Sequence, residues 1–307
     1  MLFRAARSVA GTSRLCAPRY LSGKAAKPPL VASSLNDKGV LTLTFQQEKK
    51  LNAWTLPLME QFAAEIDAAK TRDDVNGVVI TGGGNYYSAG VDLSALLKPM
   101  APSKLVLALR TKNQAVFDQF INFNKPIAAA INGPAIGAAV TTATLTDVMV
   151  ASETATFSLP FAKVGVPAEG CSSVTFSEWM GQTVAQRMLG PEMWIPTAAE
   201  AKEVGFPIAE IVPGGNAALV ARAVELVEAR IARGGGRRFD EAERVRLARI
   251  NADESARLAN AVVSPPFLEA MKQFNQKRNP QVAFFFSAAK ATLPLWRPAP
   301  VEPAYNC

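Results

Sequence analysis

Hydrophobic and polar positions along the first part of the chain repeat with two different periods, which predict strands and helices in turn. Residues 40–45 alternate apolar side chains with threonine, a pattern typical of a strand. Residues 55–70 then place apolar side chains at helical spacing. The short apolar run at 78–80, which leads into three consecutive glycines, indicates a second, buried strand. A strand, a helix and another strand in this order predict a parallel sheet.

The same alternation continues to about residue 213, after which the pattern becomes mostly helical. A helix interrupted at Gly181 is expected at 176–189. The pattern predicts an α/β core over 35–213, a helical subdomain over 214–290 that covers the active site or a neighbouring subunit, and a Pro-rich tail over 291–307. The remaining expected segments are helices at 105–123, 137–145, 198–204, 217–233, 240–261 and 265–277, and strands at 127–131, 148–151 and 208–212.

The first 30 residues differ in composition from the rest of the chain. They are rich in arginine, alanine and serine, contain no acidic residue and lack the long apolar stretch of a secretory signal. This composition is typical of a mitochondrial transit peptide, and a tail without function is the alternative. The six basic residues before Asp37 account for most of the formal net charge, which falls from +7 to +1 without them. The basic balance therefore belongs to the leader and argues against a nucleic-acid partner.

Several residue types are scarce or absent, which excludes whole classes of chemistry. The chain has no histidine, so imidazole bases, histidine-containing triads and histidine metal sites are ruled out. Three cysteines are too few for a disulfide framework. No apolar run reaches the ~18 residues of a membrane span, and the glycines at 82–84 lack the spacing of a dinucleotide-binding motif. We expect no metal and no redox cofactor, with acid–base chemistry left to Asp, Glu, Lys, Tyr or Cys.

Two segments of small residues suggest places where the backbone approaches a ligand closely. Residues 88–92 read Ser-Ala-Gly-Val-Asp, and residues 132–137 read Asn-Gly-Pro-Ala-Ile-Gly. Backbone amides in such turns at helix starts donate to an oxyanion without reorganisation. The alternative is that both segments only allow tight packing of helices on strands.

With these two motifs and Ala-Thr-Phe at 155–157, the chain resembles the crotonase superfamily, also called the enoyl-CoA hydratase/isomerase family, over roughly 35–280. The resemblance implies a ββα-spiral fold, in an α/β chain with a C-terminal helical subdomain, assembled as a trimer or a pair of trimers. Within the superfamily, the Pro-Ala-Glu-Gly-Cys-Ser-Ser segment at 167–173 looks most like the Δ3,Δ2-enoyl-CoA isomerases, particularly the peroxisomal-type group.

By the same resemblance, individual positions acquire expected roles. The backbone N–H groups of Val91 and Ala138 would form the oxyanion hole, and the region around Phe267 often reaches a neighbour's coenzyme A site in the family. The residues expected to line the coenzyme A cleft are Ala53, Ser88, Ala89, Gly90, Val91, Asp92, Gly137 and Ala138, and the cations that are candidates to meet its phosphates are Lys49, Lys50, Lys277 and Arg278.

Glu169 is the residue expected to carry the chemistry. A double-bond shift removes a proton from C2 and returns one to C4, so one carboxylate suffices, and Glu169 matches the isomerase carboxylate. Family hydratases use two glutamates, and the matching positions here are Thr141 and Phe161, which are neither acids nor bases. A glutamate in an uncharged loop should have a raised pKa, which suits a base that also returns the proton. The alternative is an exposed loop acid before a helix capped by Ser172 or Ser173.

Three other side chains are weaker candidates for chemistry. Asp92 and Asp147 are candidates for additional catalytic acids, as in dienoyl-CoA isomerases, but structural roles are favoured for both. Cys171 beside the base is a possible nucleophile, yet nothing near it in the sequence would deprotonate it, which favours a packed thiol.

The sequence therefore predicts a mitochondrial-matrix Δ3,Δ2-enoyl-CoA isomerase of unsaturated fatty-acid β-oxidation, whose partner is an acyl-CoA substrate. A peroxisomal location is the alternative, although the chain ends in Ala-Tyr-Asn-Cys and not in a Ser-Lys-Leu type address. Alternative functions are another crotonase reaction, either hydration or acyl-CoA hydrolysis, and a non-catalytic acyl-CoA-binding protein.

Overall fold

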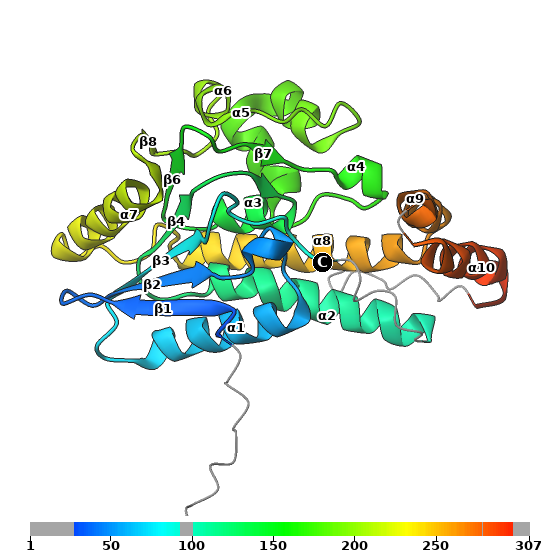
Figure 1. The fold of residues 1–307 in the computed structure, drawn as a ribbon, viewed down its shortest axis with the longest axis horizontal. Coiled ribbons are helices and arrows are strands. Elements are labelled where there is room, and N and C mark those ends of the chain that lie inside the picture. The colour runs from blue at the N-terminus through cyan, green and yellow to red at the C-terminus, as the bar shows by residue number, and fades with distance from the viewer. Residues whose placement is uncertain (1–27, 93–100, 278, 297–307) are drawn as a thin grey trace, which may run out of the picture.

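A computed structural model describes residues 28–92, 101–277 and 279–296 of the chain (Figure 1). Its main sheet has the strand order β1-β2-β3-β4-β6-β8, in which β1 runs antiparallel to β2 and every other pair is parallel. The strands are β1 (Val31–Leu35), β2 (Val40–Phe45), β3 (Gly77–Gly82), β4 (Ile127–Ile131), β6 (Val148–Ser152) and β8 (Glu210–Val212). A second, two-stranded parallel sheet pairs β5 (Ala135–Ile136) with β7 (Phe157–Ser158).

Helices connect these strands and cover them. Thr55 begins the first helix by accepting a hydrogen bond from the Leu58 N–H through its side chain, and Pro57 follows in the first turn, where its missing N–H costs nothing. The helices are α1 (Leu56–Thr71), α2 (Pro102–Ile121), α3 (Ala138–Ala143), α4 (Phe161–Val164), α5 (Ser172–Leu189), α6 (Ala198–Glu203), α7 (Gly215–Ala232), α8 (Glu241–Val262), α9 (Pro265–Gln276) and α10 (Pro280–Trp296), with a 3₁₀ turn at Glu48–Lys50.

The main sheet is buried on both faces, which explains why the residues of its central strands are mostly apolar. In β3, Val78 and Ile80 enter the large core, whereas Val79 between them faces the opposite side and packs in a second cluster with α7. Ala128 and Ala130 of β4 also belong to that second cluster. Helix α7 lies within the predicted subdomain 214–290, yet it covers one face of the sheet (Figure 1).

The long helix α8 packs along α2, and α9 packs against α10 at the end of the molecule opposite α7 (Figure 1). Phe267 of α9 is buried against Phe286 of α10 in a separate apolar cluster. α10 continues to Trp296, into the segment 291–307 that was predicted as a tail. The division of the chain at residue 213 remains a prediction.

Most predicted segments match observed ones, and the differences have local causes. The pattern missed β1, whose residues Ser33 and Ser34 are polar and face solvent at the edge of the sheet. It also missed β5 and β7, which are two residues long. Gly181 does interrupt α5, with φ 77° and ψ 157°. Residues 1–27, which hold most of the predicted leader, lie outside the described part of the chain.

Among the described residues, no helix combines the length and the apolar character that crossing a lipid bilayer would demand.

Candidate active site

The 88–92 segment is held against a neighbouring loop by backbone hydrogen bonds. The Ala89 N–H donates to the Leu51 carbonyl at 2.9 Å, and the Trp54 N–H donates to the Gly90 carbonyl at 2.8 Å. The Asp92 N–H in turn donates to the Trp54 carbonyl at 3.1 Å. Ala53 lies inside this loop, so the structure brings it beside the 88–92 segment.

Two buried polar side chains lock this arrangement from inside. The Ser88 hydroxyl donates to the Asn52 carbonyl at 2.7 Å and accepts from the Gly90 N–H at 3.0 Å. Asn52 adopts a left-handed conformation with φ 52°, and its amide group donates to the carbonyls of Gly83 and Tyr86 at 2.9 and 2.8 Å. Because these groups are satisfied and buried, the turn is rigid before any ligand arrives.

The second small-residue motif lies directly against the first. The Ile136 N–H donates to the Ser88 carbonyl at 3.0 Å. A Cβ atom on Gly90 would lie 2.3 Å from the Ile136 carbonyl oxygen and 3.8 Å from the Ala138 nitrogen, so only glycine fits here. The two motifs are about 40 residues apart in the sequence and form one surface in the fold.

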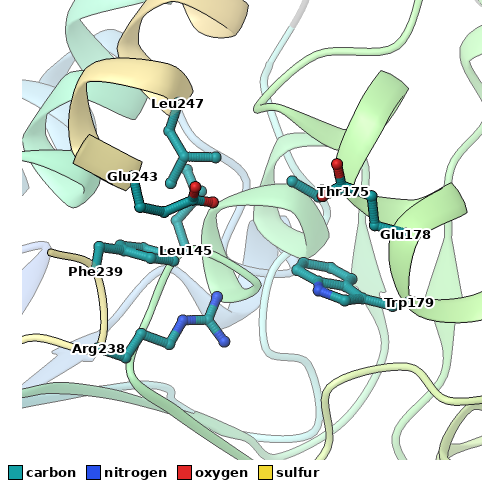
Figure 2. A pocket seen from close by; sticks show the side chains of 8 residues that line it. All are labelled: Leu145, Thr175, Glu178, Trp179, Arg238, Phe239, Glu243 and Leu247. Carbon is teal, nitrogen blue, oxygen red and sulfur yellow. The ribbon is translucent and has the colours of Figure 1, made fainter.

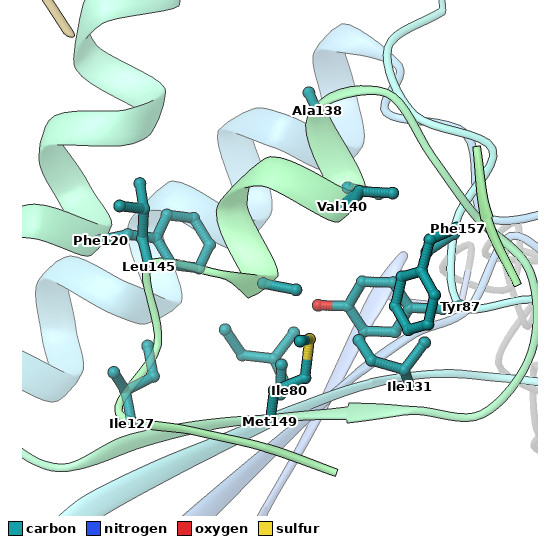
Figure 3. Close-up of a cluster of buried hydrophobic side chains, with 14 of the residues drawn as sticks. Ile80, Tyr87, Phe120, Ile127, Ile131, Ala138, Val140, Leu145, Met149 and Phe157 are labelled. Carbon is teal, nitrogen blue, oxygen red and sulfur yellow. The ribbon is translucent and has the colours of Figure 1, made fainter. Parts of the chain in front are cut away.

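The two predicted oxyanion-hole donors are located on this surface. Within the described residues, no acceptor is found for the Val91 and Ala138 N–H groups, while the neighbouring amides of Gly90, Asp92 and Gly137 are bonded. Ala138 is the first residue of α3, and α3 is anchored by Val140, which lies over β3, β4 and β6 in the core (Figure 3). Both donors are therefore available and held on rigid elements, as an oxyanion hole requires.

Glu169 lies close to this surface and is buried, with 6% of its surface exposed. Its neighbour Gly170 packs so tightly that a Cβ there would lie 2.7 Å from the Cβ and hydroxyl of Thr141, one turn along α3 from Ala138. The Thr141 hydroxyl donates to the Ala138 carbonyl at 3.3 Å. The turn that follows Glu169 therefore packs directly against α3, the helix that begins at Ala138.

The environment of Glu169 shifts its pKa in the direction that the uncharged loop predicted. Burial raises the pKa of Glu169 to about 8, and the nearby charge of Glu254 adds to this effect. A hydrogen bond from the Asn113 side chain opposes the rise in pKa. A carboxyl group with a pKa near neutrality can both remove and return a proton.

The alternative of an exposed acid before a serine-capped helix is wrong. Ser172 does not cap α5; its hydroxyl donates back to the Glu169 carbonyl at 2.7 Å. The first residues of α5 are held instead by the Glu254 carboxylate, which accepts from the Cys171 and Ser173 N–H groups.

The weaker candidates have structural surroundings. Cys171 is fully buried and its thiol donates to the Leu247 carbonyl at 3.3 Å; burial raises its pKa, which argues against a nucleophilic thiolate. Asp147 forms an ion pair with Arg237 at 2.9 Å, with both side chains buried. Asp92 is partly buried beside Trp54, and the residues that follow it lie outside the described part of the chain.

Three of the candidate phosphate-binding cations, Lys49, Lys50 and Lys277, are exposed. Lys49 and Lys50 lie in the 3₁₀ turn that precedes Ala53, next to the predicted cleft, whereas Lys277 follows α9. Arg278 lies outside the described residues. Phe267, expected near a neighbour's coenzyme A site, is buried within its own chain against Phe286.

A cavity of about 270 Å³ opens between α5 and the segment leading into α8 (Figure 2). None of the predicted site residues lines it. Figure 2 shows the Arg238 guanidinium pointing toward the space between Trp179 and Phe239. The lining residues are Leu145, Thr175, Glu178, Trp179, Arg238, Phe239, Glu243 and Leu247.

Sequence reasoning missed three residues that hold the site together. Asn113 and Glu254 sit on long helices rich in polar residues, where nothing in the pattern distinguishes them from solvent-facing neighbours. Asn52 could have been found, because asparagine between a polar turn and a small residue favours the left-handed conformation.

Comparisons with a family model, with curated relatives and with solved structures all indicate the same protein family. A sequence model of the family described as enoyl-CoA hydratase/isomerase matches residues 36–281. The chain is 37% identical to enoyl-CoA delta isomerase 2 of Rattus norvegicus, covering 58% of this chain and 45% of the relative. It is 36% identical to peroxisomal enoyl-CoA delta isomerase 3 of Mus musculus, covering 58% and 56%. The chain thus spans about half the length of these curated relatives.

Among solved structures, an enoyl-CoA hydratase/isomerase from Pseudoalteromonas atlantica superposes with a TM-score of 0.66 at 25% identity. The match covers 81% of this chain and 98% of the bacterial one, which supports the crotonase fold over nearly the whole described region.

Proposed function

Since this chain belongs to the enoyl-CoA hydratase/isomerase family, we propose that it is a Δ3,Δ2-enoyl-CoA isomerase that converts 3-cis- or 3-trans-enoyl-CoA to 2-trans-enoyl-CoA. The observation that carries this proposal is a buried carboxyl group, Glu169, with a pKa raised to about 8, in a turn that packs against α3, whose first N–H is one of two available backbone donors. The names of the rat and mouse relatives support the same reaction.

The proposed mechanism uses Glu169 as a proton shuttle. Its carboxylate removes a proton from C2 of the substrate, and the negative charge moves onto the thioester oxygen. The N–H groups of Val91 and Ala138 stabilise that oxyanion, and each such donor is worth about 3–4 kcal/mol of barrier in other enzymes. Glu169 then returns a proton to C4, which leaves the double bond conjugated with the thioester.

The reaction needs no metal or redox cofactor, because a proton leaves one carbon and another carbon receives one. Coenzyme A arrives as part of the substrate. Family hydratases activate water with two glutamates, and the matching positions here hold Thr141, whose hydroxyl is bonded to the Ala138 carbonyl, and the buried Phe161. These side chains offer no second acid or base, which favours isomerisation over hydration.

The proposal extends to the setting of the enzyme. A homotrimer or a pair of trimers is the assembly expected from the family resemblance. The arginine-rich, acid-free segment at 1–30 favours the mitochondrial matrix, where the enzyme would serve unsaturated fatty-acid β-oxidation. The peroxisome is the alternative, as the name of the mouse relative illustrates. Imaging of the chain with and without residues 1–30 separates these locations.

A direct assay tests the activity. The purified protein is given 3-cis- and 3-trans-enoyl-CoA, and formation of the conjugated 2-enoyl thioester is followed by its absorbance, with the products checked by mass spectrometry. The proposal requires a product of unchanged mass. A product heavier by one water would indicate hydration, release of free coenzyme A would indicate hydrolysis, and binding without turnover would indicate a non-catalytic acyl-CoA-binding protein.

A further inference from the structure

We propose that Glu254 of α8 is a positioning residue for Glu169, because its carboxylate clamps the turn that follows the base. This inference rests on the proposed isomerase function for its catalytic consequence, although the clamp itself can be tested without any turnover.

The turn after Glu169 has an unfavourable backbone conformation. Gly170 and Cys171 are consecutive residues with positive φ, 65° and 66°. A side chain at position 170 is excluded, since a Cβ would lie 2.5 Å from the Phe117 ring and 2.7 Å from Thr141. Cys171 adopts its left-handed conformation in spite of its side chain. Such a conformation persists only where the surroundings hold it in place.

Glu254 provides that restraint from a distant part of the chain. One carboxylate oxygen accepts from the Cys171 N–H at 2.6 Å and the other accepts from the Ser173 N–H at 2.9 Å. Glu254 is completely buried. Both oxygens accept hydrogen bonds at the start of α5, an arrangement that fits an ionised carboxylate facing the positive end of a helix.

The same part of α8 also reaches the side chain of the base. Asn113, which donates to the Glu169 carboxyl group, also donates to the Ser255 hydroxyl at 3.2 Å. Ser255 follows Glu254 directly in α8. The helix therefore holds Glu169 in two ways, through its backbone by way of Glu254 and through its carboxyl group by way of Asn113. Placing a base within a fraction of an ångström strongly affects its rate, so the clamp should affect catalysis.

The charge of Glu254 has a second consequence, since it raises the pKa of Glu169. Burial raises the pKa of Glu254 itself, while hydrogen bonds from Ser173 and Cys171 and the charge of Arg257 oppose this. Three other charged groups, from α2 and α8, influence the pKa of the Cys171 thiol in this turn. They are Asp118, Arg246 and Glu243.

The test compares Glu254→Gln with Glu254→Asp and with Asp118→Asn. Gln keeps the shape but removes the charge and one of the two acceptors, so we expect kcat to fall roughly tenfold to a hundredfold. The midpoint of the pH–rate profile should move to lower pH, because a charge that raises the pKa of Glu169 is gone.

Glu254→Asp keeps the charge but has a side chain that is one methylene shorter. It should lower kcat while leaving the midpoint nearly unchanged. Asp118→Asn removes a carboxylate from the same helix interface. Asp118 accepts from Asn251 and is not among the groups that shift the pKa of Glu169, so this change should alter neither value.

A folded Glu254→Gln protein with unchanged kcat and unchanged midpoint would overturn the proposal. A lower thermal stability alone, with both kinetic values kept, would also overturn it, since that is what a purely structural residue predicts.

The clamp is tested separately from the isomerase proposal by NMR of protein labelled with ¹³C at the glutamate carboxyl carbon. The signal of Glu169, assigned with Glu169→Gln, should titrate at lower pH in Glu254→Gln than in the unmutated protein. This result is expected even if no enoyl-CoA turns over, in which case only the proposed function fails.

If Glu254→Gln does not fold, the clamp is tested by hydrogen exchange of the Cys171 and Ser173 amides in the unmutated protein. Slow exchange supports the clamp, and exchange as fast as that of an exposed loop contradicts it.

Discussion

Glu169 and Asp147 both carry buried carboxyl groups and both lie in connecting segments, Glu169 between α4 and α5 and Asp147 just before β6. They differ in the groups that surround the carboxyl group. Asp147 pairs with Arg237 at 2.9 Å and also accepts from the Ile127 and Arg238 N–H groups at 2.8 and 2.7 Å. Arg237 uses its remaining donors on three backbone carbonyls. For Glu169, no ion pair is found among the described residues, and its carboxyl group receives a hydrogen bond from Asn113.

The difference shows why burial alone does not identify a reactive acid. The hydrogen bonds and the cation around Asp147 compensate its charge, so that region joins β4, the end of α3 and the segment before α8. Burial, and then the nearby charge of Glu254, raise the pKa of Glu169, and no cation among the described residues offsets them. Perturbed groups of this kind are typical of functional sites.

The largest effect is expected for Glu169→Gln. The proposed proton shuttle is lost, so isomerisation should fall by about 10²–10⁴-fold, the usual range for general acid–base catalysis. The fold and the affinity for an acyl-CoA should be kept, as measured by circular dichroism and calorimetry. Glu203→Gln, at an exposed position on α6, is the matched control and should retain full activity. Turnover near the unmutated level in Glu169→Gln would contradict the assignment.

The opposite result is expected for Asp147→Asn. This change leaves the Arg237 charge buried without its partner and should reduce the free energy of unfolding by about 3–5 kcal/mol. Urea unfolding measures the loss, and kcat of the folded fraction should be unchanged. Asp74→Asn breaks the exposed pair with Arg72 and should have little effect on stability. A large loss of kcat in folded Asp147→Asn would make Asp147 a second functional acid.

A smaller effect on activity is expected for Asn113→Ala. Its hydrogen bond lowers the pKa of Glu169, so removing it should move the midpoint of the pH–rate profile to higher pH. Because less of the base is then ionised at neutral pH, kcat/KM at pH 7 should fall roughly tenfold. Lys112→Ala, one residue earlier and exposed, serves as the control. An unchanged midpoint would exclude Asn113 from the site.

The last prediction concerns stability as a function of pH. The pKa of Glu169 is about 8 in the folded chain against an ordinary value of 4.5. Its contribution to stability is therefore fully present below pH 4.5 and is lost as the pH rises to about 8. Thermal unfolding between pH 5 and 9 should show a shallower decline in Glu169→Gln than in the unmutated protein. Parallel curves for the two proteins would show that Glu169 ionises freely when folded.

Elements with a strong local signal could be predicted from the sequence. The strands 78–80 and 127–131 are continuous apolar runs because both faces of the sheet are covered, and this pattern was visible without coordinates. Most long helices were predicted because each buries one apolar stripe, but α10 (Pro280–Trp296) was not predicted. β1 was not predicted, because an edge strand with exposed serines lacks a continuous run of apolar residues.

The sequence by itself determined the α/β class, the two small-residue motifs and the uncharged loop around Glu169, because these depend on residue types close together in the chain. Only the tertiary structure decided that Gly90 lies against Ile136, that Asn113 bonds the base and that Glu254 holds its turn. Glu254 and Cys171 are 83 residues apart, and a polar residue on a charged helix looks the same in the sequence whether it faces solvent or a buried turn. Burial and hydrogen-bond partners are properties of the packed chain, so the role of such residues follows from the fold.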